Sequence, residues 1–212
     1  MFDTLVRIDV GSDSEMRTFE IYKGALCFYS GYFNASLNGR FIEARDGHVK
    51  LPTEDPQIFE LFRMWIHTRR FYQSTLSPAK LLPLEMIGAL WVFGDAHDVP
   101  LLQNVMIDIM VEKVKQERTF LSVDDMIYVN NNTTHTSQLR QLVEGIYEAL
   151  TGEQLPWERF IIDDTVEGHR DSRFTNQHLQ TKIDFLRLKD PRRGHWGCKY
   201  HVHEQGASCS AG

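Results

Sequence analysis

The sequence has few cysteines, no long apolar run and no targeting segment. Its three cysteines among 212 residues are a small and odd number, which argues against a disulfide framework and for a reducing compartment. The longest apolar run, Leu81 to Gly94, contains Pro83 and Glu85 and falls short of the roughly 20 residues that span a bilayer. The N-terminus carries charges where a signal peptide needs an apolar core. We therefore expect a protein of the cytoplasm or nucleus.

The sequence also lacks a basic excess and the common catalytic motifs. Its formal net charge of −6 at pH 7 leaves no strongly basic surface to neutralise phosphates, which argues against nucleic-acid binding. A phosphate-binding glycine loop, a GxGxxG segment after a strand, a GxSxG elbow and an HExxH pair are all absent. Cys27 has no histidine or cationic partner nearby in sequence and is interpreted as a small core residue. We predict that the chain is not an enzyme.

Hydrophobic periodicity predicts an α+β protein. Alternating apolar residues predict strands over Thr4–Val10, Phe19–Lys23 and His48–Leu51, with a turn at Gly11–Glu15 after the first. A single helix is predicted from Gly24 to Leu37, stopped by Asn38 and Gly39, because apolar side chains recur at spacings of three to four residues: Leu26, Tyr29, Phe33 and Leu37.

A second helix is predicted after Asp55 and Pro56. Asp55 suits an N-cap, and Pro56 suits the first helical position, where an N–H group has no partner. The apolar stripe that follows is too wide for a helix lying alone in water, and it comprises Ile58, Phe59, Leu61, Phe62, Trp65 and Ile66. This helix should therefore lie in the core.

The segments FEIYKGALCFYSGYFNASLNGRF and VKLPTEDPQIFELFRMWIHT, in this order, resemble the BTB/POZ domain, and most of all the single-domain BTB proteins abundant in filamentous fungi. Downstream, Leu84 to Val111 looks like the closing helix pair of that family, with Val99 and Pro100 at the turn. The resemblance covers about residues 3–115 and implies the BTB/POZ fold, a small sheet capped by a cluster of helices. The resemblance departs at Tyr22, where the family usually has histidine. We therefore do not expect this chain to have the corepressor-binding groove of the family's transcriptional repressors.

We expect three parts along the chain. These are a BTB/POZ domain over residues 1–118, a mostly helical extension over residues 119–190, and a tail rich in Gly, His and Cys over residues 191–212. Within the extension, apolar periodicity predicts helices over Ser122–Asn130, Ser137–Leu150 and about Arg173–Lys189, with Gly152 ending the second of them.

The resemblance implies a protein-interaction module, and the homodimer interface of the family maps to Leu26, Phe28, Tyr29, Tyr32 and Phe33. A homodimer, or a heterodimer with another BTB chain, is therefore expected. These large side chains cannot all fit one buried stripe, so one of the two helix faces is free to meet a partner. The alternative is that C-terminal helices of the same chain cover that face.

A second surface is implied at Phe41, Ile42 and Glu43. These residues resemble the hydrophobic-x-Glu motif through which many BTB proteins dock the cullin scaffolds of ubiquitin ligases. The alternative is that Phe41 anchors its loop in the core while Glu43 is solvated, and both interpretations predict a partly buried Phe41. The function that the resemblance implies is self-association and an adaptor role for a cullin-type ubiquitin ligase.

The tail contains a constellation of metal-ligand types, Cys198-x2-His201-x-His203-x5-Cys209. These ligands suit a structural zinc ion, and an extended backbone would project both histidines to the same side. The alternatives are a glycine-rich terminus with solvated histidines and a disulfide between Cys198 and Cys209. A zinc-bound tail would indicate a different class of function, a transcriptional or regulatory factor.

Overall fold

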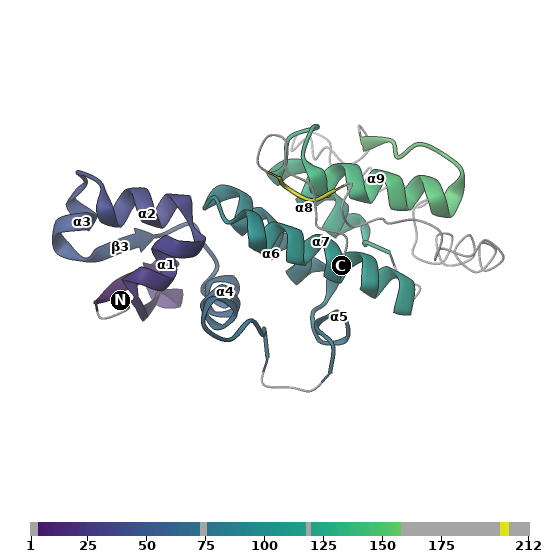
Figure 1. Cartoon of the computed structure of the whole chain (residues 1–212). Helices are drawn as coiled ribbons and strands as arrows, with labels where there is room; N and C mark the ends of the chain where they lie inside the picture. The colour runs from purple at the N-terminus through teal and green to yellow at the C-terminus, as the bar shows by residue number, and fades with distance from the viewer. Residues whose placement is uncertain (1–3, 73–75, 118–119, 158–199, 204–212) are drawn as a thin grey trace. The chain divides into compact units, whose positions relative to one another are not determined.

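The computed structural model describes residues 4–72, 76–117, 120–157 and 200–203 (Figure 1). The predicted α+β class is confirmed: the described strands form one small mixed sheet near the N-terminus, and helices make up most of the rest. The chain divides into two compact units. The first comprises Met1–Leu81 with Phe93–Leu102, and the second comprises Leu82–Val92 with Gln103–Gly212. The helix predicted over Arg173–Lys189 lies outside the described residues.

The sheet of the first unit has the strand order β2-β1-β3. Its strands are β1 (Leu5–Val10), β2 (Arg17–Tyr22) and β3 (His48–Leu51), which confirms the three predicted strands to within two residues. β1 runs antiparallel to β2 and parallel to β3. The turn after β1 begins at Gly11, whose φ of 84° lies in the region that favours glycine. Apolar side chains of all three strands, such as Ile8, Ile21 and Val49, are buried.

The single helix predicted from Gly24 to Leu37 is wrong, because the chain forms two helices there. These are α1 (Lys23–Tyr29) and α2 (Gly31–Asn38). Ser30 between them has extended dihedral angles, and its Oγ accepts from the Phe33 N–H at 3.1 Å and donates to the His97 carbonyl at 2.6 Å. Gly31 donates to the Asp98 carbonyl at 2.9 Å, and a Cβ at this position would collide with the Asp98 carboxylate. The break therefore gives the chain two close contacts with the segment after α6 (Leu84–Ala96).

Two further helices flank β3. α3 (Ile42–Asp46) was not predicted, and it ends at Gly47, which has a φ of 62°. α4 (Pro56–Thr68) begins as predicted, because the Asp55 side chain accepts from the Gln57 N–H at 2.6 Å and Pro56 is the first helical residue. The six apolar residues predicted to form its inner stripe are all buried. α3 is thus a short surface helix and α4 a core helix.

The remaining described helices follow in order: α5 (Pro78–Leu81), α6 (Leu84–Ala96), α7 (Pro100–Glu117), α8 (Val123–Asn132) and α9 (Gln138–Thr151). The predicted helix pair is confirmed as α6 and α7, with Val99 in the turn. α8 begins with a capping box in which Ser122 and Asp125 satisfy each other's backbone N–H groups. α9 begins at its predicted cap, Ser137, and ends at Gly152, whose φ is 72°. The first two of the three helices predicted for the extension are therefore confirmed.

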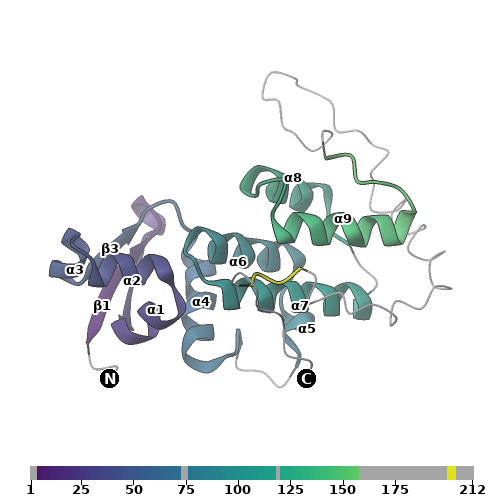
Figure 2. The ribbon, with the colours of Figure 1, turned by 45° about the horizontal axis from the view of Figure 1, so that its top comes forward.

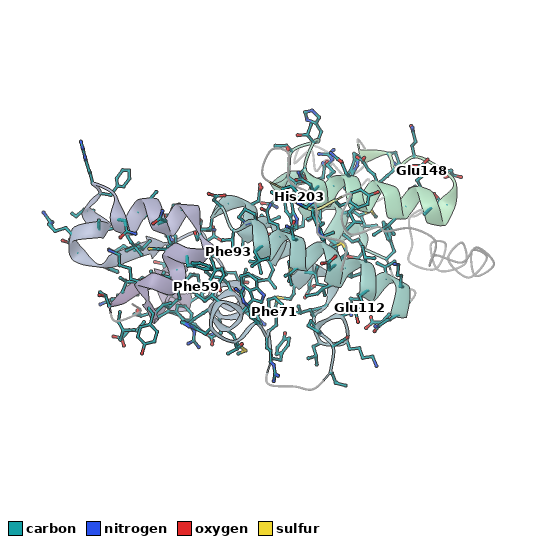
Figure 3. The ribbon with its side chains drawn as sticks, in the orientation of Figure 1. Phe59, Phe71, Phe93, Glu112, Glu148 and His203 are labelled. Atoms are coloured by element: carbon teal, nitrogen blue, oxygen red, sulfur yellow. The ribbon has the colours of Figure 1, made fainter. Side chains whose placement is uncertain are left out.

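Aromatic side chains fill the core of the first unit. Phe59 of α4 and Phe93 of α6, both labelled in Figure 3, pack edge to face with ring centroids 6.0 Å apart. Phe62 lies 5.0 Å from Phe93 and stacks on Phe33 of α2 at 6.3 Å. Each of these four rings is at most 2% exposed. The core therefore fixes which faces of α2 and α4 are turned away from solvent.

The described part of the second unit is helical (Figure 2). Phe120 and Tyr147 lie 6.1 Å apart, and the Arg140 guanidinium lies 4.5 Å from the ring centroid of Trp157. The buried side chains of α9 recur at helical spacing along one stripe: Leu139, Leu142, Val143, Ile146 and Tyr147. α8 and α9 therefore belong to a second packed core and do not form a loose appendage.

Candidate protein-interaction surface

The five aromatic and apolar residues predicted for a dimer interface do not share one environment. Leu26 and Phe33 have no exposed surface and belong to the core. Tyr29 is half-buried, with its ring 5.7 Å from Trp65. Phe28 is 74% exposed and Tyr32 is 37% exposed. Because a side chain without exposed surface cannot contact a partner, the surface reduces to Phe28 and Tyr32, with Tyr29 at its edge.

The two exposed aromatic rings are held by neighbours in the first unit. Phe28 meets Tyr29 edge to face at 4.7 Å, and Tyr32 meets the buried His97 edge to face at 5.0 Å. Their positions follow from the break at Ser30, which orients α1 and α2 independently. Within the described part of the first unit Phe28 stays 74% exposed, and the alternative, that C-terminal helices of the same chain cover this face, remains a prediction. Aromatic residues in this setting are typical binding residues.

The hydrophobic-x-Glu segment begins α3. Phe41 is the N-cap residue and is 62% exposed, and Ile42 is 61% exposed. The interpretation of Phe41 as a core anchor is therefore wrong. Phe41 is only partly buried, as both interpretations predicted, and most of its surface is exposed. The Glu43 carbonyl accepts from Gly47, and the Gly47 carbonyl accepts from the Arg7 N–H of β1, each at 2.9 Å. α3 thus presents two large apolar side chains from a turn anchored to the sheet.

A network of polar side chains that the sequence did not predict joins the three strands. Asp9 of β1 is buried, and its carboxylate accepts two hydrogen bonds from Arg7, one from Thr18 and one from His48, at 2.7 to 3.1 Å. The hydrogen bond from Arg7 is the main cause that holds the pKa of the Asp9 carboxyl well below its usual range. All its partners come from the sheet itself. We therefore assign this carboxylate a structural role.

The end of α4 forms a cationic and aromatic corner. Arg69 has a φ of 60°, and its guanidinium lies 4.1 Å from the ring centroid of Tyr29 and 4.6 Å from that of Trp65. The adjoining hollow measures about 450 Å³ and is lined by Arg69, Arg70, Phe71, Tyr72, Leu76, Pro78 and Leu81. In the sequence Arg69 and Arg70 form a short basic pair, a pattern that by itself is typical of solvated surface. Cation–π contacts instead hold Arg69 against the aromatic rings.

The candidate catalytic and metal residues form no complete site among the described residues. Cys27 is half-buried, and burial raises the pKa of its thiol, which makes it a weaker nucleophile at neutral pH. The expectation that no cation lies near Cys27 is wrong, because Lys23 acts on the thiol and lowers its pKa by less than burial raises it. The rings of His201 and His203 lie 6.0 Å apart, while Cys198 and Cys209 lie outside the described residues. No group of three potential metal ligands occurs within the described ranges. The zinc site therefore remains a prediction.

Comparisons with known proteins assign no family or function to these surfaces. The sequence matches no protein-family model and no curated protein. Among the helices that the structure describes, none has the length and apolar character needed to cross a membrane. The functional interpretation therefore depends on the residues themselves, above all on the exposed apolar side chains of α1, α2 and α3.

Proposed function

We propose that this chain is a protein-interaction module of the BTB/POZ type, which self-associates and serves as an adaptor for a cullin-type ubiquitin ligase. The observation that carries the proposal is the exposure of Phe41 and Ile42 immediately before Glu43, on the short anchored helix α3. The order of elements supports it: two antiparallel strands, three short helices, a third strand parallel to the first, and then a core helix, a further short helix and a helix pair. This order agrees with the sequence resemblance.

The physical argument concerns the two side chains that begin α3. Burying a phenylalanine or isoleucine side chain stabilises a complex by about 1.5–3 kcal/mol, and here both are largely exposed in the free chain. The Glu43 carboxylate lies two residues from Phe41, so a groove that accepts the ring can also offer a cation or N–H donor to the carboxylate. Such a combination of an apolar anchor and a charged rim is typical of a small, specific docking site.

The adaptor role predicts that Phe41→Ala weakens binding to a cullin scaffold at least tenfold, which corresponds to about 1.4 kcal/mol or more. Purified full-length chain would be titrated against an immobilised cullin, with binding measured by interferometry. Phe28→Ala is the matched control, because it removes the same ring from a different exposed position and should bind as wild type does. Absence of cullin binding by wild type, or equal binding by Phe41→Ala, would contradict the adaptor role.

Self-association predicts the opposite pattern for the same two variants. Phe28→Ala should shift the monomer–dimer equilibrium toward the monomer by about tenfold or more, since an exposed aromatic ring at the centre of an interface contributes 1–2 kcal/mol or more. Sedimentation velocity over about 1 to 100 µM gives the dissociation constant of a dimer stabilised by roughly 5.5–8 kcal/mol. Phe41→Ala should dimerise normally. A wild-type chain that stays monomeric throughout would exclude self-association while leaving the cullin experiment independent.

A further inference from the structure

One side chain of α7 hydrogen-bonds both main-chain polar groups of a residue near the C-terminus. The Asn104 Oδ1 accepts from the Val202 N–H at 2.6 Å, and the Asn104 Nδ2 donates to the Val202 carbonyl at 3.0 Å. The two residues are 98 positions apart in the sequence. Figure 2 shows the segment of residues 200–203, in yellow, beside α7. The contact lies within the second unit.

A carboxamide that pairs in this way recognises the main chain and not the identity of the side chain. It offers one acceptor and one donor to a single residue, as a neighbouring strand does in a sheet. Recognition of extended peptides commonly combines such main-chain hydrogen bonds, which supply affinity, with side-chain contacts, which supply specificity. Asn104 therefore supplies the first of these two components.

The residues on either side of Asn104 and Val202 supply the second component. His201 donates from Nε2 to Asp108 Oδ1 at 3.0 Å, and its side chain is only 11% exposed. Asp108 lies four residues after Asn104, so the two side chains share one face of α7. Tyr200 is 3% exposed and thus buries an aromatic ring next to the paired residues. Three consecutive residues of the segment are therefore held by a buried ring, a hydrogen bond between histidine and carboxylate, and a main-chain pair.

We propose that this face of α7 is a binding site for an extended protein segment, that residues Tyr200–His203 are its built-in occupant, and that a partner segment with the order Tyr-His-Val displaces them. The occupant belongs to the same chain as the site, so a partner segment competes with an intramolecular contact. A partner segment must therefore bind tightly, or be held nearby by another contact, to replace it. The site lies in the second unit, apart from the Phe28 and Phe41 surfaces of the first.

The probe that tests the site is a fluorescent synthetic peptide with the sequence of Lys199–Glu204, KYHVHE. Its binding to the full-length chain is measured by anisotropy for wild type, for Tyr200→Ser and for Tyr200→Ser combined with Asn104→Leu. Tyr200→Ser weakens the built-in occupant, so this variant should bind the peptide at least tenfold more tightly than wild type does. The added Asn104→Leu should abolish that gain, because leucine fills the space of asparagine but forms no hydrogen bonds.

Two outcomes would overturn the proposal. One is equal peptide binding by wild type and Tyr200→Ser. This outcome includes the case in which neither protein binds the peptide at concentrations up to about millimolar. The other is unchanged binding after Asn104→Leu. A second measurement controls for misfolding: exchange of the Val202 amide, followed by NMR, should be slowed in wild type and fast in Asn104→Leu, while the amides of α8 and α9 stay protected. A Val202 amide that remains protected in Asn104→Leu would contradict the main-chain pairing directly.

Discussion

Replacement of Phe33 by alanine is expected to lower the free energy of unfolding by about 3–5 kcal/mol, whereas Phe28→Ala should change it by less than about 0.5 kcal/mol. The two phenylalanines are five residues apart in neighbouring helices, but Phe33 is fully buried and Phe28 is 74% exposed. Urea unfolding of the two variants and wild type, with equal slopes required for the comparison, measures the difference.

The large effect at Phe33 follows from its surroundings. Its ring stacks on Phe62 at 6.3 Å and on His97 at 5.7 Å, and it meets Phe59 edge to face at 6.4 Å. Alanine would leave a cavity among two rings of α4 and the His97 ring after α6, which cannot all collapse into it. A loss below about 1 kcal/mol for Phe33→Ala would contradict this packing. It would also restore Phe33 as a candidate interface residue.

Elements with local signals were predictable from the sequence. Asp55 and Pro56 begin α4, Ser122 begins α8, and Ser137 and Gly152 bound α9, all as the sequence indicated. Each of these signals acts within about four residues, because a capping side chain satisfies an N–H group of the first turn. The strands were predictable for a similar reason, because the alternation of apolar and polar residues within one segment indicates which face of that strand is buried.

The break between α1 and α2 was not predictable from periodicity. The spacing of apolar residues runs through Ser30 without interruption, so a single helix satisfies the local pattern. What favours the break is a partner 67 residues away, the His97 carbonyl that accepts from the Ser30 hydroxyl. α3 escaped prediction for another reason, because five residues are too few to establish a helical period. Tertiary contacts decided the first case and element length the second.

The candidate site was predictable only as a set of residues. The sequence indicated that the large apolar and aromatic side chains between positions 26 and 33 could not all be buried. It did not indicate which of them would remain exposed. The core decides which, since Phe33 packs against two rings of α4 and against His97 after α6, whereas Phe28 is 74% exposed. The pairing of Asn104 with Val202 lay beyond any local pattern, because it joins residues 98 positions apart.

Asp9→Asn is expected to lower the free energy of unfolding by about 2–4 kcal/mol at pH 7, because hydrogen bonds to a buried charged group are worth roughly 1.5–3 kcal/mol each and several share this carboxylate. Asparagine keeps the size but replaces one acceptor oxygen with a donor, which would face the Arg7 guanidinium or the His48 ring. Thr18 would keep one acceptor. Urea unfolding at pH 7 measures the loss.

The pH dependence of the stability difference between wild type and Asp9→Asn tests whether the ionised carboxylate causes that difference. The pKa of Asp9 is lowered in the folded state, mainly by the hydrogen bond from Arg7. In the unfolded chain the carboxyl has a pKa of about 3.9. The unfolded chain therefore takes up a proton at pH values where the folded chain does not. The contribution of Asp9 is therefore complete at neutral pH and is lost as the pH falls below about 5. The difference between wild type and Asp9→Asn should shrink over the same interval.

Asp46 provides the matched control for this experiment. Its carboxylate pairs with Arg45 at 2.8 Å, and that hydrogen bond also lowers its pKa, but both side chains are exposed at the surface. Solvent screens such a pair, so Asp46→Asn should have a much smaller effect than Asp9→Asn at every pH. A difference between wild type and Asp9→Asn that stays constant from pH 7 to pH 3 would show that shape, and not the ionised carboxylate, joins the three strands.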